Sequence, residues 1–160
     1  MKKEIKLKPI GVIHTPYKEP KGIPIQGKFD KGVRGTIRLF PKYRAGLKDV
    51  EGFSHLILIY YFNRSREEWL AGRPFLEDKE HGIFAIRSPH RPNHIGFSIV
   101  KLKRVKGNTI TFSEVDMLDG TPLLDIKPYV AHFDSRVHVK SGWIDRHFKG
   151  KKIPNRIKLK

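Results

Sequence analysis

Residues 116–129 read D-M-L-D-G-T-P-L-L-D-I-K-P-Y, and this stretch gathers the side chains most suited to acid–base chemistry. It carries the carboxylates of Asp116, Asp119 and Asp125 and the phenol of Tyr129. Carboxylates accept hydrogen bonds from hydroxyl and ammonium groups, and a positioned carboxylate or phenolate acts as a general base. The sequence therefore predicts a polar site built partly from this stretch.

A second stretch, residues 82–98, reads G-I-F-A-I-R-S-P-H-R-P-N-H-I-G-F-S. Pro89 and Pro92 fix their own backbone angles and bias the residues before them towards extended conformations. Arg87 precedes this stiff loop, and its guanidinium suits a bidentate pair with a carboxylate or a phosphate. Loops at strand ends often hold binding groups, although an ordinary proline-rich turn between two strands is the alternative.

The carboxylates have structural alternatives as well. Asp119 precedes Gly120, which is typical of a turn. Asp125 can form an ion pair with Lys127 or Arg87 that serves only the fold, since clustered charges are often structural.

Metal and cysteine chemistry is not expected. The chain has no cysteine, which excludes disulfides and thiolate ligands. His90 and His94 are four residues apart, but Pro92 prevents the helix that would align them as ligands. We predict no metal site.

The balance of charge favours a nucleic-acid partner. The chain has 160 residues, a length typical of a single domain, and a net charge of +17. Such a charge attracts polyanions, although a lysine-rich surface is also typical of heat-adapted proteins. We find no apolar run long enough to span a membrane and no signal peptide, so we expect a cytoplasmic protein without membrane attachment.

Short alternating segments predict a mainly β protein, either an antiparallel barrel or a sandwich, with few short helices. No G-x-G-x-x-G motif links a strand to a helix, which argues against a Rossmann fold. The most apolar segment, residues 55–62, is expected to be a central, fully buried strand. The predicted strands cover residues 10–14, 33–40, 55–62, 82–87, 95–105, 109–115, 123–126 and 136–139, with a further edge strand at 1–8, loops at 17–31 and 71–81, and a helical turn within 43–50.

The two stretches resemble the signatures F-A-T-R-S-x-x-R-P-N-P-I-G and D-G-T-P-V-x-D-I-K-P-Y. These belong to the TrmO-like (TsaA-like) family of S-adenosylmethionine-dependent tRNA methyltransferases. Further matches lie in the same order as in that family and extend the resemblance from about residue 8 to about residue 134. They are I-G-V-I-H-T-P-Y from Ile10, P-I-Q from Pro24 and G-F-S-H-L from Gly52.

The resemblance implies a compact non-Rossmann β-barrel that binds S-adenosylmethionine as a homodimer. It also implies a substrate, a tRNA adenosine beside the anticodon whose 6-amino nitrogen carries a threonylcarbamoyl group and receives the methyl group. Carried over residue by residue, the cofactor-binding set is Pro24, Ile25, Gln26, Asn63, Arg64, Arg87, Phe97, Asp116, Met117, Leu118 and Asp119.

The sequence departs from the family pattern in three places. Ile25 stands in place of the usual arginine, so a side-chain contact is lost there while backbone contacts remain. Asn63-Arg64 replaces the commoner His-Gln pair, which puts that contact in doubt. His94 replaces a proline and loosens one end of the loop.

Methyl transfer from a sulfonium is an in-line displacement in which positioning does most of the work. The attacking nitrogen lies between a purine and a carbonyl, so a general base should help by removing its proton. Asp119, Asp125 and Tyr129 are the candidates for this base. We expect His90, Arg91 and Asn93 to contact the substrate, for example its threonyl carboxylate or a phosphate.

The expected domain is residues 1–160, with a basic tail at about 149–160 that holds six basic side chains. The tail is either solvated or an ordered arm that grips the tRNA backbone, and its alternation at Ile157 and Leu159 favours order. Two other functions remain open. One is an enzyme that uses the same cofactor on another substrate, and the other is a basic RNA-binding β-barrel without catalysis.

Overall fold

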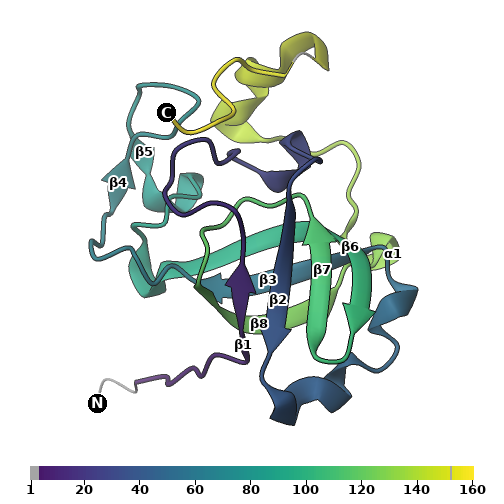
Figure 1. The fold of residues 1–160 in the computed structure, drawn as a ribbon. Helices are drawn as coiled ribbons and strands as arrows, with labels where there is room; N and C mark the ends of the chain where they lie inside the picture. Colours follow the sequence, from purple (N-terminus) through teal and green to yellow (C-terminus); the bar gives the residue numbers. More distant parts are fainter. Residues whose placement is uncertain (1–3, 152) are drawn as a thin grey trace.

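A closed antiparallel barrel forms the centre of the molecule, in the strand order β1–β2–β7–β6–β3–β8 (Figure 1). The computed structural model describes residues 4–151 and 153–160. The barrel confirms the expected mainly β architecture, although it is closed and is not a sandwich. Its strands are β1 (Gly11–His14), β2 (Arg34–Leu39), β3 (His55–Tyr61), β6 (Ile95–Lys106), β7 (Thr109–Ser113) and β8 (Thr121–Pro128).

Short strands and helices lie at the two ends of the barrel. The strands β4 (Ala71–Gly72) and β5 (His81–Gly82) pair with each other outside it. The helix α1 (Ala131–Asp134) is a single turn. The 3₁₀ helices are η1 (Gly27–Phe29), η2 (Pro41–Leu47), η3 (Val50–Gly52), η4 (Ile83–Ala85), η5 (Pro92–His94) and η6 (Gly142–Lys151).

Alternating side chains fill the barrel. On β3, Leu56, Leu58 and Tyr60 point into the core and are almost completely buried. The neighbouring outward side chains are only half-buried or exposed, so the prediction of a fully buried strand was wrong for one face. Burying each large apolar side chain stabilises the fold by about 1.5–3 kcal/mol. The fully buried part of this core is completed by Ile13, Ile37, Val100, Ile110, Phe112, Val115 and Leu123.

Gly96 on β6 leaves room for the Tyr60 ring of the neighbouring strand β3. The two residues are cross-strand partners, and a Cβ atom on Gly96 would lie 2.1 Å from the Tyr60 ring. Tyr60 then hydrogen-bonds through its hydroxyl to Ser98 Oγ, at 2.9 Å. The glycine is therefore needed for a polar contact at the rim of the barrel, close to the second motif.

The prediction of a strand at residues 82–87 was wrong for the residues that follow Gly82. Residues 83–85 form the 3₁₀ turn η4, closed by a hydrogen bond from Ile86 N to Ile83 O. This turn buries Ile83 and Ile86 together and leaves Phe84 79% exposed. Because residues three apart share one face of a 3₁₀ helix, burial of the two isoleucines overrides the alternation seen in the sequence.

Two other predicted strands do not form in the described residues. Residues 136–139 are exposed and cross from α1 to η6 without pairing, because no strand edge of the barrel lies beside them. Residues 4–8 are also not a strand, and residues 1–3 of that prediction lie outside the described residues. The predicted loop at 71–81 carries the short strands β4 and β5 at its ends.

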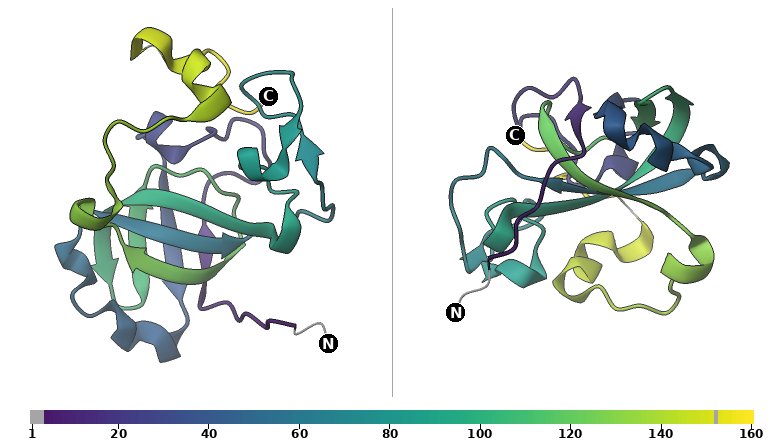
Figure 2. Two further views of the ribbon diagram at one scale, coloured as in Figure 1. Left: turned by 180° about the vertical axis from the view of Figure 1, so that it is seen from behind. Right: turned by 90° about the horizontal axis from the view of Figure 1, so that it is seen from below.

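The C-terminal tail returns to the P-I-Q loop and contacts it through its backbone. Lys158 forms an antiparallel β-bridge with Pro24, and Ile25 N donates to Ile157 O at 2.7 Å. Residue 152 of the tail lies outside the described residues. Figures 1 and 2 show η6 and the tail at one end of the barrel, while the N-terminal segment leaves from the other.

No helix in the described part of the chain has both the length and the apolar character needed to cross a membrane.

Candidate active site at the barrel rim

The Asp116 carboxylate joins the barrel wall to the loop that carries the P-I-Q motif. Its Oδ1 atom accepts a hydrogen bond from Ser98 Oγ at 2.5 Å, and its Oδ2 atom accepts one from Gly27 N at 2.9 Å. Glu114, just before it, has a left-handed φ of 68° that turns the chain over the rim after β7. A Cβ atom on Gly27 would lie 1.8 Å from Glu114 O, so only glycine permits this close approach.

Burial raises the pKa of Asp116 to about 6. The hydrogen bonds from Ser98 and Gly27 oppose this rise, as does the positive charge of Arg87, but they only partly offset the loss of solvent. Burial also raises the pKa of Tyr60, which keeps its hydroxyl protonated as a donor to Ser98. Tyr60, Ser98 and Asp116 thus form one hydrogen-bonded chain from the core to the rim.

Arg87 lies directly beside this network. Its Nη1 atom donates to Gln26 Oε1 at 2.9 Å, and its guanidinium lies 5.7 Å from the centre of the Phe97 ring. Phe97 is 41% exposed on the outer face of β6. These three cofactor candidates border a hollow of about 310 Å³ on the outside of the barrel wall, lined by Gln26, Gly27, Lys28, His55, Arg87, Phe97, Ile99, Glu114 and Tyr129.

Asp119 lies at a separate hollow of about 330 Å³, lined also by His14 and Arg34. It accepts hydrogen bonds from Lys18 Nζ at 2.6 Å and from Thr15 N at 3.1 Å. The Lys18 contact is the main cause that holds the pKa of Asp119 at about 2, well below its ordinary value. A carboxylate of that pKa is a weak proton acceptor but a good partner for a cationic group.

The remaining cofactor candidates differ in their position relative to these two hollows and in the exposure of their side chains. Arg64 Nη1 donates to Lys18 O at 2.6 Å, so the Asn63-Arg64 pair lies next to the Asp119 loop. Met117 is buried in the core and Pro24 is also buried, so only their backbones are available to a ligand. Ile25 and Leu118 are half-buried.

The three residues predicted to contact the substrate lie in the loop that follows Arg87, and two of them hold it in place. His90 stacks on Trp69 with ring centres 4.2 Å apart, and its Nδ1 atom hydrogen-bonds to Ser65 Oγ at 2.9 Å. Arg91 Nη1 donates to Ile86 O at 2.9 Å. Asn93 is exposed and has a left-handed φ of 64°. Trp69 also contacts this loop, and the motifs did not indicate it.

The three candidate bases lie in different surroundings. Tyr129 lines the Arg87 hollow. Asp125 forms an ion pair with Lys127 at 2.7 Å and accepts from Ile126 N at 2.9 Å, which is the structural pairing that the sequence left open. Asp119 belongs to the other hollow.

Among the described residues, no three histidine, cysteine, aspartate or glutamate side chains gather in a way that would hold a metal ion.

The barrel with this rim site resembles known proteins along most of its length. The sequence profile of the tRNA-methyltransferase O N-terminal domain matches residues 12–135. A probable S-adenosyl-L-methionine-binding protein of Pyrococcus abyssi is 51% identical over 88% of this chain and 76% of its own length. The human tRNA (adenine(37)-N6)-methyltransferase is 35% identical over 82% of this chain and 31% of its own length.

The crystal structure of TrmO from Pseudomonas aeruginosa superposes with a TM-score of 0.76 at 34% identity, covering 88% of this chain and 63% of that one. Together these findings define a β-barrel of the methyltransferase O class. The chain belongs to the TrmO family, which confirms the resemblance seen in the motifs. It spans less than two thirds of the solved TrmO chain and about a third of the human relative.

The raised pKa of Asp116 predicts a pH dependence of stability. Because its folded pKa of about 6 lies above the ordinary value of 3.8, the folded state binds this proton more tightly than the unfolded state. The resulting stabilisation is complete below pH 3.8 and is lost as the pH rises through 6. We expect the free energy of unfolding of the wild type, relative to Asp116→Asn, to fall by about 2–3 kcal/mol across this window.

Urea unfolding of both proteins at pH values from 4 to 7 measures this difference. Asparagine keeps the shape of the side chain but does not titrate, so the comparison cancels the opposite contributions of Asp119 and other carboxylates. A difference that stays constant or increases with pH would contradict the burial of Asp116.

Proposed function

We propose that the chain is an S-adenosylmethionine-dependent tRNA methyltransferase, acting on the 6-amino nitrogen of threonylcarbamoyladenosine next to the anticodon. The observation that carries the proposal is the meeting of Gln26, Arg87 and Phe97 at one hollow, beside Asp116, in a chain of the TrmO family. The names of the relatives, which include S-adenosyl-L-methionine-binding proteins and tRNA methyltransferases, support the same cofactor and substrate.

The residues at the rim fit this cofactor in chemical type. Arg87 offers an exposed guanidinium for a carboxylate, and Asp119 offers a carboxylate for an ammonium or a ribose diol. The exposed Phe97 ring offers an apolar face for a purine. A hollow of about 310 Å³ lies at the small end of the range for small-molecule sites, about 300–1,000 Å³.

When bound, S-adenosylmethionine supplies an activated methyl group on its sulfonium. The protein's part is to hold the acceptor nitrogen in line and to accept its proton. We propose Asp119, Asp125 and Tyr129 as candidates for this proton transfer, and of the three only Tyr129 lines the same hollow as Arg87. Single-turnover rates of Asp119→Asn, Asp125→Asn and Tyr129→Phe would distinguish them.

The other proposed contacts follow the same arrangement. We assign the cofactor set named from the sequence to this rim, with backbone contacts from Pro24, Ile25, Met117 and Leu118. We assign substrate contact to the loop of His90, Arg91 and Asn93. Its anchoring contacts to Trp69 and Ile86 would fix it before the tRNA arrives. Loss of tRNA binding in Asn93→Ala, with cofactor binding unchanged, would support the second assignment.

Further parts of the proposal concern the chain as a whole. We infer that residues 1–160 form one domain, which a single cooperative unfolding transition would support. A cytoplasmic location follows from a tRNA substrate and is open to cell fractionation.

The tail at 149–160 remains a proposed tRNA-binding arm, although Lys158 and Arg156 already pair with Asp30 and Asp78. Gel-shift assays of Lys149→Ala would test it.

The exposed apolar side chains of β3 and β6 support a homodimer. Tyr61 and Ile95 are cross-strand partners, Phe97 and Ile99 follow on the same outer face, and all four are 37–41% exposed. In the left view of Figure 2, β3 and β6 run across the front of the barrel. Because Phe97 also borders the cofactor hollow, a partner on this face would cover the site.

We therefore expect the wild type to sediment as a dimer and Ile95→Lys to sediment as a monomer, because a buried unpaired lysine opposes association. Val137→Lys is the matched control, since Val137 is exposed on the segment that leads to η6. Sedimentation velocity measures both. A monomeric wild type, or an Ile95→Lys variant that remains dimeric, would reject this interface.

Nucleoside analysis tests the proposed reaction directly. Incubation with S-adenosylmethionine and tRNA that carries threonylcarbamoyladenosine should yield a nucleoside heavier by one methyl group, detected by mass spectrometry. Unmodified tRNA is the control and should give no product. Cofactor binding without this product would favour another substrate, and RNA binding without cofactor binding would favour a non-catalytic module.

Arg87→Lys should weaken S-adenosylmethionine binding by about 1.5–3 kcal/mol, the usual contribution of a hydrogen bond to a charged group. A lysine cannot copy the planar fork of arginine. Calorimetry measures the affinity, with Arg38→Lys on the outer face of β2 as control. If Arg87 serves only the fold, the variant will have a lower melting temperature and an unchanged affinity.

A further inference from the structure

The family match ends at residue 135, yet residues 142–160 return to the end of the barrel that carries the cofactor site. This C-terminal segment comprises η6 and the tail. Figures 1 and 2 show it lying over the loops at that end and not over the core. Its contacts fall on two stretches of chain, and each stretch leads directly to a cofactor residue.

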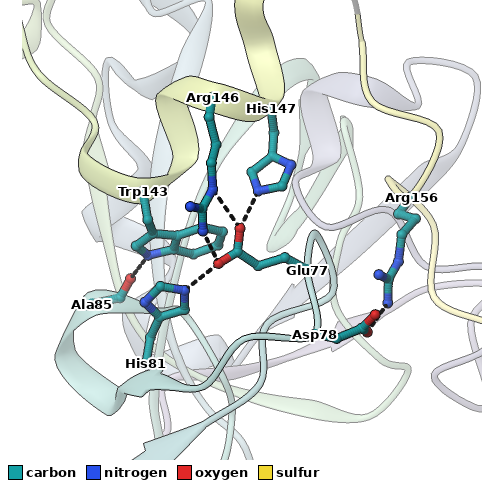
Figure 3. Close-up of polar contacts among 8 residues, drawn as sticks. All are labelled: Glu77, Asp78, His81, Ala85, Trp143, Arg146, His147 and Arg156. Atoms are coloured by element: carbon teal, nitrogen blue, oxygen red, sulfur yellow. Dashed lines mark hydrogen bonds and ion pairs between the residues drawn. The ribbon is translucent and has the colours of Figure 1, made fainter.

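The first stretch is the loop before Arg87, which is attached through Glu77 (Figure 3). The Glu77 carboxylate accepts hydrogen bonds from Arg146 Nε at 2.8 Å, His147 Nε2 at 2.5 Å and His81 Nε2 at 2.7 Å. Its side chain is only 11% exposed. The Arg146 contact is the main cause that lowers the pKa of Glu77 to about 2. The carboxylate therefore stays ionised and joins η6 to this loop.

Trp143 extends the attachment towards Arg87. Its indole stacks on His81 with ring centres 4.6 Å apart, and its Nε1 atom donates to Ala85 O at 2.8 Å. Ala85 lies two residues before Arg87, at the end of the 3₁₀ turn η4. Arg156 adds an ion pair with Asp78 at 3.0 Å.

The second stretch is the P-I-Q loop with the residues that follow it. The tail pairs with it through the Pro24–Lys158 bridge and through backbone hydrogen bonds on either side, including Ile25 N to Ile157 O at 2.7 Å. Lys158 also pairs with Asp30 at 2.7 Å. The Ile25 contact adjoins Gln26, the residue that binds Arg87.

We propose that the described residues 142–151 and 153–160 form a clasp that positions Gln26 and Arg87 for cofactor binding, with Glu77 and Trp143 as positioning residues. One continuous segment holds both supporting loops, and the two loops meet at the 2.9 Å hydrogen bond between Arg87 and Gln26. An exposed arginine otherwise loses side-chain entropy when it binds a ligand, and holding it in place beforehand raises affinity. The inference rests on the proposed cofactor function of this rim.

Glu77→Gln should raise the dissociation constant for S-adenosylmethionine about tenfold, because one neutral amide oxygen cannot replace a carboxylate that accepts from the Arg146 guanidinium and from the rings of His81 and His147. The rate at saturating cofactor should change less than twofold, since the clasp touches no reacting atom. Asp134→Asn is the matched control. It likewise replaces a hydrogen-bonded side-chain carboxylate by an amide, but Asp134 accepts its bond from Val130 N and makes no contact with η6 or the tail among the hydrogen bonds of the described residues.

Trp143→Phe keeps the stacking on His81 and removes only the hydrogen bond to Ala85. It should raise the dissociation constant by about three- to fivefold, and it remains informative if Glu77→Gln does not fold. Unchanged cofactor affinity in folded Glu77→Gln or Trp143→Phe would overturn the proposal.

A double-mutant cycle separates positioning from general stability. If the clasp acts through the Gln26–Arg87 pair, Glu77→Gln should weaken binding much less in a Gln26→Ala background. An equal loss in both backgrounds would overturn positioning through this pair. The melting temperature of each variant shows how much of the effect follows from stability alone.

Amide hydrogen exchange without cofactor keeps this inference distinct from the proposed function. In Glu77→Gln, exchange should quicken in both residues 22–27 and residues 83–88, while the core strand β3 remains protected. Faster exchange in residues 83–88 alone would overturn a clasp on both loops. A wild type that fails to bind S-adenosylmethionine would reject the proposed function, while this exchange comparison still decides the clasp.

Discussion

The Asp116 carboxylate joins two parts of the molecule that have no backbone pairing in common. One oxygen accepts from Ser98 on the barrel wall, and the other accepts from Gly27 at the start of η1. The wall is rigid because its strands pair around a filled core, whereas the η1 loop belongs to no sheet. A single buried carboxyl group thus transmits the rigidity of the barrel to the loop that carries Gln26. This contact has a cost, since burial disfavours the charged form and raises its pKa.

Where burial on one face decides the structure, the sequence predicted the strands well. The alternation of residues 33–40 and 95–100 places every second side chain in the core, and both predicted segments form barrel strands close to the expected bounds. In the second half of β6 a register shift between Leu102 and Arg104 interrupts this pattern. The strand predictions were wrong for segments that pack or run outside the barrel. Ile83 and Ile86 read as part of a strand, but they are buried together by a 3₁₀ turn. Val137 and Val139 alternate without any strand to receive them.

For the candidate site as well, the sequence predicted residues that lie in local motifs and missed residues that act through long-range contacts. The motifs indicated Arg87, Gln26 and Phe97 separately. In the structure the three side chains meet, although Arg87 and Gln26 are 61 residues apart in the sequence. The motifs did not indicate Glu77 or Trp143, which lie in no shared motif. No local pattern in the sequence distinguishes either residue. Glu77 and Trp143 contact each other's segments only because the C-terminal segment folds back onto the loop before Arg87.

The size of the barrel explains why support from outside is needed. Its interior is filled by side chains such as Leu58, Ile110 and Phe112, which leaves no room inside for a ligand. A ligand must therefore bind on the outer wall and rim, where loops supply the polar groups and carry more conformational freedom than strands. The Asp116 contact fixes one of these loops from within the barrel, and the C-terminal segment reaches both loops from outside. Because that segment lies beyond the matched family region, its contacts can differ between relatives while the barrel stays the same. The affinity of the rim for its ligand would then be adjustable through residues that neither touch the ligand nor contribute to the core.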